Sequence, residues 1–391
     1  MQIKPEIAAF HDDMTAWRRD FHAHPEIGFE EVRTSAIVAE KLESWGIKVT
    51  RGLGGTGLVG TIVGKSPSNR AIGLRADMDA LPMQEANQFA HASKNPGKMH
   101  GCGHDGHTTM LLGAARYLAQ TRDFSGTVQL IFQPAEEGLG GATRMIAEGL
   151  FERFPVDAVY GVHNWPGMPV GSFGLREGAL LASVDDFTIT ITGKGGHAAM
   201  PHLAVDPIVT AGHVLVALQS IVARNMDPNQ GGVITVGAIH GGSAHNVIPQ
   251  SVVMQGTARA LSAPVRDLLE SRLKILVTNI AAAHGAHAEI DYQRKFPVLV
   301  NTPGETEFAA ETADEIFGKP AVIRDAGPVM GSEDFAAMLE KCPGAYAFIG
   351  QGDGAGCSNS VHNPSYDFND TILPIGATYF ARLVERALPL V

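Results

Sequence analysis

The densest chemistry in the sequence is the eight-residue segment HGCGHDGH at 100–107, which holds three histidines, a thiol and a carboxylate. Its three glycines let the backbone turn tightly, so that neighbouring side chains can converge on one point. Imidazole nitrogens and thiolates are ligands of divalent transition metals. The segment therefore indicates a metal site, with a surface loop of the same composition as the alternative interpretation.

A second candidate is the carboxylate pair Glu136 and Glu137, which follows the apolar run VQLIFQPA. We expect residues 126–137 to form a buried strand that ends in this pair. Adjacent carboxylates there lose hydration and repel each other, a cost that nearby positive charge would relieve. Neighbours on an extended segment point opposite ways, so one could bind metal while the other faces a water molecule. A solvated acidic turn is the equally open alternative.

Two further histidines could complete a metal site. His163 ends the predicted strand AVYGVH, and His362 lies in the loop SVHNPSYDFND. Parallel-sheet proteins place catalytic groups at such strand ends and turns. A lone histidine is more often a structural hydrogen-bonding group, so the inference depends on the whole set.

The elements that must position these residues alternate between helix and strand in the first half of the chain. In order, the sequence predicts helices at 3–22 and 30–46, strands at 57–64 and 71–77, a helix at 107–120, a strand at 126–137, a helix near 140–150 and a strand at 157–163. This alternation is typical of an α/β fold, with a mostly parallel sheet covered by helices. At 391 residues the chain exceeds what one hydrophobic core usually serves, so two domains are expected.

The pattern changes between residues 184 and 293, where the predicted order is β-α-β-β-α-β. Its elements are predicted at 186–193, 204–223, 231–239, 251–260, 263–285 and 288–293. This is the ferredoxin-like arrangement. We expect it to be a lid inserted into a catalytic domain formed by residues 1–183 and 294–391.

The composition limits which kinds of binding partner and which cellular compartment are expected. The net charge of −11 and the lack of a basic run argue against a nucleic-acid partner and favour a small-molecule substrate. No segment approaches the roughly 18 to 20 consecutive apolar residues of a membrane span, and the first residues lack the pattern of a secretory signal, so no membrane partner is expected. Cys102, Cys342 and Cys357 are a sparse, odd set, which indicates a reducing, cytoplasmic setting.

The ordered motifs resemble the metallopeptidase family that contains aminoacylases, succinyl-diaminopimelate desuccinylases and related carboxypeptidases. Within it, the chain is most similar to the branch of hippurate hydrolases and plant auxin-conjugate amidohydrolases. The resemblance covers nearly the whole chain and depends on RADMDALP (75–82), HGCGHDGH (100–107), PAEEG (134–138), GVHNWP (161–166), GKGGHAAMPH (193–202), NVIP (246–249), GSEDF (331–335) and HNPSYDFND (362–370).

The resemblance implies two metal ions held by five side chains, namely Cys102, His104, Glu137, His163 and His362. Five ligands are too few for two closed sites, so water or hydroxide and the substrate complete them. Cys102 would bridge the two ions as a thiolate. Mixed N, O and S ligands accept Zn, Mn, Co or Ni. Asp79 and Asp105 are implied to orient ligand histidines.

The activity implied by the resemblance is metal-dependent hydrolysis of the amide bond of an N-acyl amino acid. Glu136 would act as general base and pass its proton to the leaving nitrogen. His197 and Asn246 would stabilise the oxyanion, with His197 reaching across a homodimer formed by the lid. Arg259 would hold the substrate carboxylate. A turn histidine and an exposed strand arginine are the alternative interpretations of His197 and Arg259.

Hippurate-like N-aroyl and N-acyl amino acids are the expected substrates, with N-acetyl amino acids next. The runner-up is a metallo-carboxypeptidase or dipeptidase that acts on short peptides. A different class of enzyme would use Cys102 as a nucleophile beside His104 or His107, and alkylation but not chelation would inactivate it. A catalytically silent metal-binding or scaffold protein is the third class. Glu136 beside Glu137 argues against that class, since a structural metal site has no use for an unliganded base.

Overall fold

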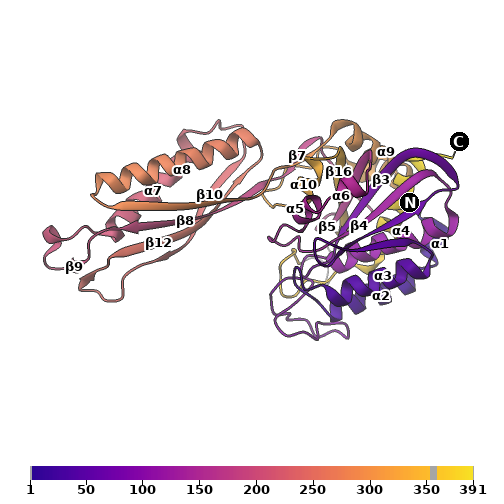
Figure 1. The fold of residues 1–391 in the computed structure, drawn as a ribbon, viewed down its shortest axis with the longest axis horizontal. Helices are drawn as coiled ribbons and strands as arrows, with labels where there is room; N and C mark the ends of the chain where they lie inside the picture. The colour runs from indigo at the N-terminus through magenta and orange to yellow at the C-terminus, as the bar shows by residue number, and fades with distance from the viewer. Residues whose placement is uncertain (1, 353–358, 391) are drawn as a thin grey trace. The chain divides into compact units, whose positions relative to one another are not determined.

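The computed structural model describes residues 2–352 and 359–390 (Figure 1). Cys357 lies outside the described residues. The chain divides into two compact units. The core unit comprises Met1–Leu180, Val300–Gly327 and Asp334–Val391, and the lid unit comprises Leu181–Leu299 and Pro328–Glu333. The lid unit is thus somewhat longer than the insertion expected at 184–293.

The core unit is built on an eight-stranded sheet in the order β1-β2-β4-β3-β5-β16-β6-β15. Its strands are β1 (Lys48–Leu53), β2 (Gly57–Val63), β3 (Ser66–Asp77), β4 (Ser125–Gln133), β5 (Ala158–Pro166), β6 (Phe173–Gly174), β15 (Val322–Ile323) and β16 (Gly344–Gly352). The four central strands β4, β3, β5 and β16 run parallel, and β1 and β2 pair antiparallel with their neighbours. Strand β6 pairs antiparallel with β16 and parallel with β15. The expectation of an α/β fold with a mostly parallel sheet is confirmed, and the carboxyl ends of the central strands meet at one edge.

The sequence of the central strands explains their place in the sheet. All nine residues of β16 and eight of the nine residues of β4 are buried. Near-continuous apolar runs are typical of parallel strands that are covered on both faces. Such strands cannot lie at a solvated edge without exposing apolar side chains, so they occupy the middle of the sheet.

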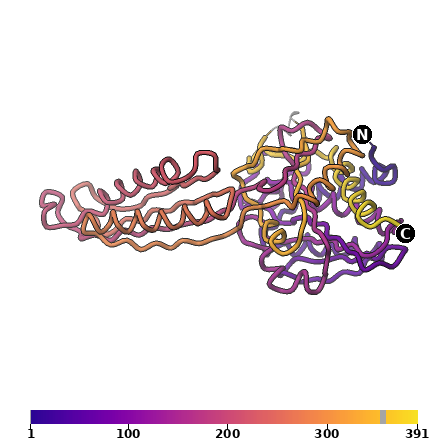
Figure 2. The backbone as a smooth tube through the Cα atoms, turned by 90° about the horizontal axis from the view of Figure 1, so that it is seen from above, coloured from indigo at the N-terminus to yellow at the C-terminus, as the bar shows by residue number. Residues whose placement is uncertain are grey.

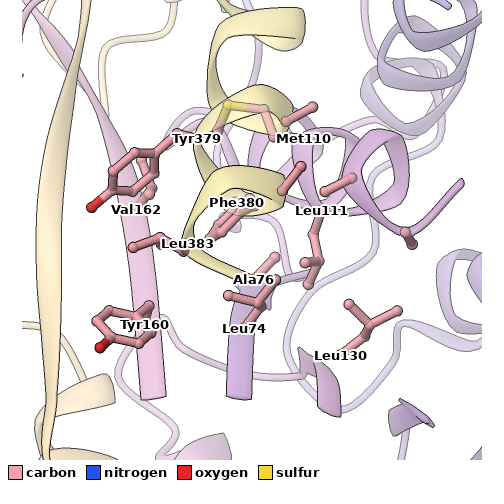
Figure 3. Close-up of a cluster of buried hydrophobic side chains, with 14 of the residues drawn as sticks. Leu74, Ala76, Met110, Leu111, Leu130, Tyr160, Val162, Tyr379, Phe380 and Leu383 are labelled. Carbon is pink, nitrogen blue, oxygen red and sulfur yellow. The ribbon is translucent and has the colours of Figure 1, made fainter. Parts of the chain in front are cut away.

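Helices surround this sheet. Those of the core unit are α1 (Pro5–Ala8), α2 (His11–Ala23), α3 (Val32–Ser44), α4 (His104–Thr121), α5 (Gly141–Ala147), α6 (Leu150–Arg153), α9 (Pro303–Phe317), α10 (Phe335–Leu339) and α11 (Leu373–Ala387). Figure 3 shows Met110 and Leu111 of α4 and Phe380 of α11 packed with Leu74 of β3 and Val162 of β5. Both termini lie in the core unit, where α1 contacts α11 (Figure 2). This packing fixes the start of α4, which carries part of the candidate site.

The lid unit contains a four-stranded antiparallel sheet in the order β10-β12-β8-β13. Its elements are β8 (Ser183–Thr192), β9 (Gly196–His197), α7 (Pro207–Arg224), β10 (Gly232–His240), β11 (Val247–Ile248), β12 (Ser251–Ala260), α8 (Ala263–Ala283) and β13 (His287–Phe296). Helices α7 and α8 pack on the sheet around a core of their own. Both helices begin as their sequences predict, with Pro in the first turn and a side-chain cap from Asp206 or Ser262. The strand order and the β-α-β-β-α-β sequence are those of a ferredoxin-like fold.

Helix α7 is long and apolar enough to cross a membrane by length and composition alone, with a mean hydropathy of 1.3. The sequence predicts this segment as a helix of the insertion at 204–223. Its buried residues, among them Ala211, Val214, Leu218 and Ile221, recur every three or four positions. That spacing is the apolar stripe of a helix that covers a sheet, and these residues belong to the core of the lid unit.

Several predicted elements differ from the observed ones. The single helix predicted at 3–22 is two helices, and β1 was not predicted. The strand predicted to reach Glu137 ends at Gln133, because Pro134 has no N–H to donate to the sheet and Ala135 adopts a positive φ of 53°. Helix α4 begins at His104 rather than at His107, directly after the left-handed Gly103.

Candidate metal centre

The candidate ligands of the core unit lie where the central parallel strands end. Strand β3 ends at Asp77, the turn after β4 carries Glu136 and Glu137, and His163 lies in the last part of β5. Because carboxyl ends of parallel strands meet at one edge of a sheet, segments that are distant in sequence converge there. The site therefore follows directly from the strand order.

The loop before α4 brings Cys102 and His104 to the same edge. Gly103 between them has a φ of 95°, and a Cβ atom at this position would collide with Asn164 Oδ1 and the hydroxyl of Tyr366. Only glycine fits both the left-handed backbone and the close approach. The Gly103 turn therefore sets the relative directions of the two side chains.

Two groups of potential ligands share the Cys102 thiol. One is Cys102, His104 and His163, and the other is Cys102, Glu137 and His362; within each group the ligand atoms lie within 4.8 Å of one another. The Cys102 Sγ atom is 3.4 Å from His163 Nε2, and His362 Nε2 is 3.3 Å from Glu137 Oε1. The structure thus brings together all five side chains that the resemblance implied as ligands.

Two buried polar atoms in this cluster indicate whether its residues could hold a metal ion. His104 Nε2 makes no hydrogen bond of acceptable geometry within the described part of the chain, and Glu137 Oε1, 3.9 Å away, has only its ion-pair contact with His362 Nε2. An unsatisfied buried polar atom costs about 1–3 kcal/mol. Divalent cations between nitrogen, oxygen and sulfur donors of this kind would satisfy both atoms, so the residues fit transition-metal ions.

The electrostatics of the ligands argue against a thiol nucleophile. Burial and the charge of Glu137 raise the pKa of the Cys102 thiol, whereas an activated cysteine needs a lowered pKa. Burial and the neighbouring His107 hold the pKa of His163 well below its usual value, so its imidazole is neutral. Cys102 and Glu137 raise the pKa of His362 to about 10. The Cys102 thiol and the His362 imidazolium therefore carry protons that a bound cation would displace.

Asp79 connects two of the ligand segments. Its Oδ1 atom accepts from His104 Nδ1 at 3.1 Å, and its Oδ2 atom accepts from the backbone N–H of Glu137 at 2.9 Å. A carboxylate on one ring nitrogen fixes the tautomer and leaves the other nitrogen for a metal. The position of Asp79 suits the orienting role expected from the sequence.

Asp105 lies elsewhere than expected. Rather than a ligand histidine, its Oδ2 atom contacts His22 Nδ1 of α2 at 2.9 Å. Asp105 follows His104 in the first turn of α4, and successive side chains of a helix point about 100° apart. Burial opposes a charge on His22, but hydrogen bonds to Asp105 and Glu85 raise its pKa to about 9. Asp105 therefore pairs with a buried imidazolium.

His107 and Asp77 form a supporting pair that the sequence analysis did not assign. His107 Nδ1 donates to Asp77 Oδ1 at 2.6 Å, and its Nε2 atom lies 2.7 Å from Asn164 Oδ1. Asp77 and His107 could also hold a metal together with His104, but both ring nitrogens of His107 are already engaged. The RAD triplet that ends β3 was the available signal, since Arg75 Nη1 donates to Asp77 at 2.7 Å.

Glu31 is a second residue that the sequence did not reveal. It is fully buried and accepts from the backbone N–H of Ala135 at 2.8 Å and from the Thr56 hydroxyl at 2.5 Å. Burial raises the pKa of this carboxyl to about 7. Because Ala135 has a left-handed backbone immediately before Glu136, Glu31 holds the turn that presents the carboxylate pair.

In the lid unit, His197 and Asn246 lie close together. Strand β9, which ends at His197, pairs with β11, and the N–H of Ala198 donates to the Asn246 carbonyl at 3.1 Å. His197 is exposed, and its Nδ1 atom accepts from the N–H of Ala199 at 3.0 Å. This contact leaves Nε2 as the atom that carries the proton of a neutral ring.

Arg259 lies on β12 and donates from Nη1 to the Ser332 hydroxyl at 3.0 Å within the lid unit. It is half-buried, and burial lowers its pKa from the usual value. A guanidinium in this state keeps its charge and several donors, which is what recognition of a carboxylate requires.

Comparison with known proteins identifies the family. Residues 73–386 match the model of peptidase family M20/M25/M40. The chain belongs to this family. Hippurate hydrolase of Campylobacter jejuni is 43% identical over 390 residues, 99% of this chain and 100% of the relative. IAA-amino acid hydrolase ILR1-like 2 of Arabidopsis thaliana is 41% identical over 383 residues, 96% of this chain and 85% of the relative.

A solved structure supports the same assignment of this chain to the M20/M25/M40 family. The crystal structure of the YXEP protein of Bacillus subtilis, described as a dinuclear metal binding peptidase from the M20 family, matches with a TM-score of 0.84 and 34% sequence identity. The match covers 98% of this chain and 100% of that one. The resemblance inferred from the ordered motifs is thus confirmed.

Metal uptake by the metal-free protein should be linked to proton release. At neutral pH the Cys102 thiol and the His362 imidazolium must each lose a proton before they can bind an ion. Apparent affinity should therefore rise between pH 6 and 8, by about tenfold per pH unit for each proton released. Calorimetric titration with Zn²⁺ in buffers of different ionisation enthalpy measures the proton count. A pH-independent affinity would contradict this assignment of the ligands.

Proposed function

We propose that this protein is a metal-dependent amidohydrolase that cleaves the amide bond of N-acyl amino acids and releases a carboxylate and a free amino acid. The observation that carries the proposal is the pair of ligand groups sharing Cys102, with a further buried carboxylate, Glu136, beside them. Hippurate hydrolase and IAA-amino acid hydrolase, the relatives that match along the whole chain, support an N-aroyl or N-acyl amino acid as the substrate.

Two divalent metal ions held by the five ligands would polarise the scissile carbonyl and lower the pKa of the attacking water. Glu136 would take a proton from that water and then deliver it to the leaving nitrogen. Its Oε2 atom lies 4.0 Å from His104 Nε2, next to the ligand cluster. A positioned base of this kind contributes on the order of 100- to 10,000-fold.

The lid unit would supply the remaining recognition. His197, with its proton on Nε2, and Asn246 would donate to the oxyanion that forms at the carbonyl. Arg259 would hold the carboxylate of the substrate through its planar fork. The short backbone link between β9 and β11 supports a shared role for the first two residues.

The metal and the compartment are further parts of the proposal. Zn, Mn, Co and Ni all accept this mixture of donors. Cys102 and Cys342 are both buried and free of disulfides. Since a thiolate ligand is lost when it is oxidised, we propose that the enzyme works in a reducing cytoplasm.

Replacing Glu136 by Gln should abolish turnover while both ions stay bound. The amide keeps the shape of the carboxylate but cannot accept the proton, so kcat for N-benzoylglycine should fall by at least about 100-fold. Turnover and metal content, the latter by elemental analysis, would be measured on the same preparation. Loss of an ion together with activity would make Glu136 a ligand instead.

The matched control is Glu137→Gln, which should lose both metal and activity because Glu137 belongs to a ligand group.

The wild-type enzyme should be inactivated by a chelator and restored by added Zn²⁺ or Mn²⁺. It should cleave N-benzoylglycine and N-acetyl amino acids faster than dipeptides. Activity that survives complete metal removal would overturn the proposed function.

We also propose that the enzyme is a homodimer that associates through α7 of the lid unit. Ile208, Val209 and Val216 are between 48% and 74% exposed on this helix. The segment contains no Asp, Glu or Lys, and its one Arg is the last residue. An apolar outer face with so little charge is typical of a surface that another subunit covers.

Val216→Glu should convert the dimer to a monomer, because two buried like charges at a symmetric contact repel each other. The substitution should leave the fold intact, since this side chain is 74% exposed. Size-exclusion chromatography with light scattering measures the mass. Val32→Glu on α3, where the side chain is 68% exposed, is the matched control and should stay dimeric. A wild-type monomer would end the proposal.

If His197 acts in the partner's site, two inactive variants should complement each other. Subunits with His197→Ala and subunits with Glu136→Gln would be mixed and allowed to exchange. Each hybrid dimer contains one site with both residues intact, so some turnover should return. Absence of recovery despite demonstrated exchange would place His197 in the site of its own subunit.

A further inference from the structure

Helix α2 inserts a fully buried arginine among the segments that carry the ligands. Arg18 is 0% exposed. Its Nε atom donates to Asp370 at 2.6 Å and its Nη1 atom to Asp367 at 2.9 Å, and Nη1 also lies 3.7 Å from Asp105. One guanidinium therefore contacts three carboxylates from two distant parts of the chain.

These carboxylates lie next to two segments that carry candidate ligands, namely the first turn of α4 and the stretch that follows His362. Asp105 directly follows His104, whereas Asp367 lies five residues after His362 in the same irregular segment. Arg18 therefore spans from the loop of Cys102 and His104 to the loop of His362.

A second side chain on the same face of α2 reinforces this connection. His22, one helical turn after Arg18, places Nδ1 2.9 Å from Asp105 and Nε2 3.1 Å from Glu85. Residues four positions apart on a helix lie side by side. We call Arg18 and His22 the α2 clasp.

The loop of His362 needs such support. His362 has a positive φ of 65°, its side chain is 53% exposed, and residues 359–369 contain no helix or strand. Its N–H donates to the carbonyl of Gly101 at 2.7 Å, which links it directly to the ligand loop. A left-handed, non-glycine backbone persists only where the surroundings hold it. The α2 clasp supplies that constraint from the other end of the loop.

Stability alone does not explain a buried arginine with several carboxylates. Well-packed apolar residues often replace buried ion pairs without loss of stability, whereas a guanidinium that donates to two different carboxylates fixes their relative positions. The contacts of the α2 clasp instead suit a role in setting the distance between the segments that carry His104 and His362.

We propose that Arg18 is a positioning residue that fixes the spacing between His362 and the Cys102–His104 loop, so that the second ligand group can form. This inference rests on the proposed metal centre. In the group of Cys102, His104 and His163, His163 is held by β5 and His104 also by Asp79, so this group should tolerate loss of the clasp. The group of Cys102, Glu137 and His362 does not.

Arg18→Met in the full-length protein tests this role. The metal-free variant would be titrated with Co²⁺, with the thiolate absorption band and calorimetry as readouts. Affinity for one of the two ions should fall about 10- to 100-fold, as for other residues that orient ligands, while the other ion and the thiolate band are retained. Arg18→Lys should recover part of the loss, since it restores the charge without the fork.

Arg386→Met is the matched control. Arg386 joins α11 to α9 in the same unit through Thr312 and Glu311, away from the ligand loops. It should lower the melting temperature without changing either Co²⁺ affinity. Should Arg18→Met fail to fold, Asp367→Asn removes one arm of the clasp with less disturbance and should weaken the same ion.

The results separate this inference from the proposed function. A wild-type protein that binds fewer than two ions would overturn the metal centre, and the positioning role with it. A wild-type protein that binds two ions, combined with unchanged or equally weakened affinities in Arg18→Met, would overturn the positioning role alone. Selective loss of one ion, absent from Arg386→Met, would support it.

Discussion

The candidate metal centre is built around one sulfur atom, Cys102 Sγ, which belongs to two groups of potential ligands. Around Cys102, side chains from four separate segments lie close enough to hold cations, and two of their atoms are buried without hydrogen-bond partners among the described residues. Such an arrangement is costly unless positive charge occupies it. The parallel strands, the Gly103 turn and the left-handed backbone at His362 all serve to bring these donors to one place. The proposed chemistry follows from that convergence, because ligands supplied by separate loops can leave coordination positions open for water and substrate.

Much of this arrangement could be predicted from the sequence, for physical reasons. Parallel strands buried on both faces are continuous apolar runs, as in β4 and β16, and their alternation with helices reveals the sheet. The insertion was recognisable because its helical and strand patterns follow the order β-α-β-β-α-β, which interrupts the alternation of the first half of the chain. Metal ligands are also recognisable, because few residue types bind transition metals and those in HGCGHDGH are separated by glycine.

The supporting contacts could not be predicted, since they join residues that are far apart in the sequence. Arg18 and Asp370 are separated by 352 positions, and Glu31 and Ala135 by 104. No local pattern in α2 distinguishes a buried arginine from a solvated one. Asp105 illustrates the same limit at short range: its partner is decided by which way the first turn of α4 faces, and that depends on the packing of α4 against α2 and α11.

The carboxylate pair shows where the expected local structure was wrong. The alternation of a strand was expected to separate Glu136 from Glu137, but β4 ends at Gln133 and both residues lie in the irregular segment after it. Ala135 instead turns the backbone with a positive φ just before the pair, and Glu31 holds that turn by accepting the Ala135 N–H. Burial raises the pKa of Glu31 to about 7, so this acceptor adds less negative charge beside Asp79 than an ordinary carboxylate would. A neutral or partly protonated acid can therefore support the turn without competing for the cations that the neighbouring carboxylates would bind. The turn that presents Glu136 and Glu137 thus depends on a third carboxyl group, that of Glu31.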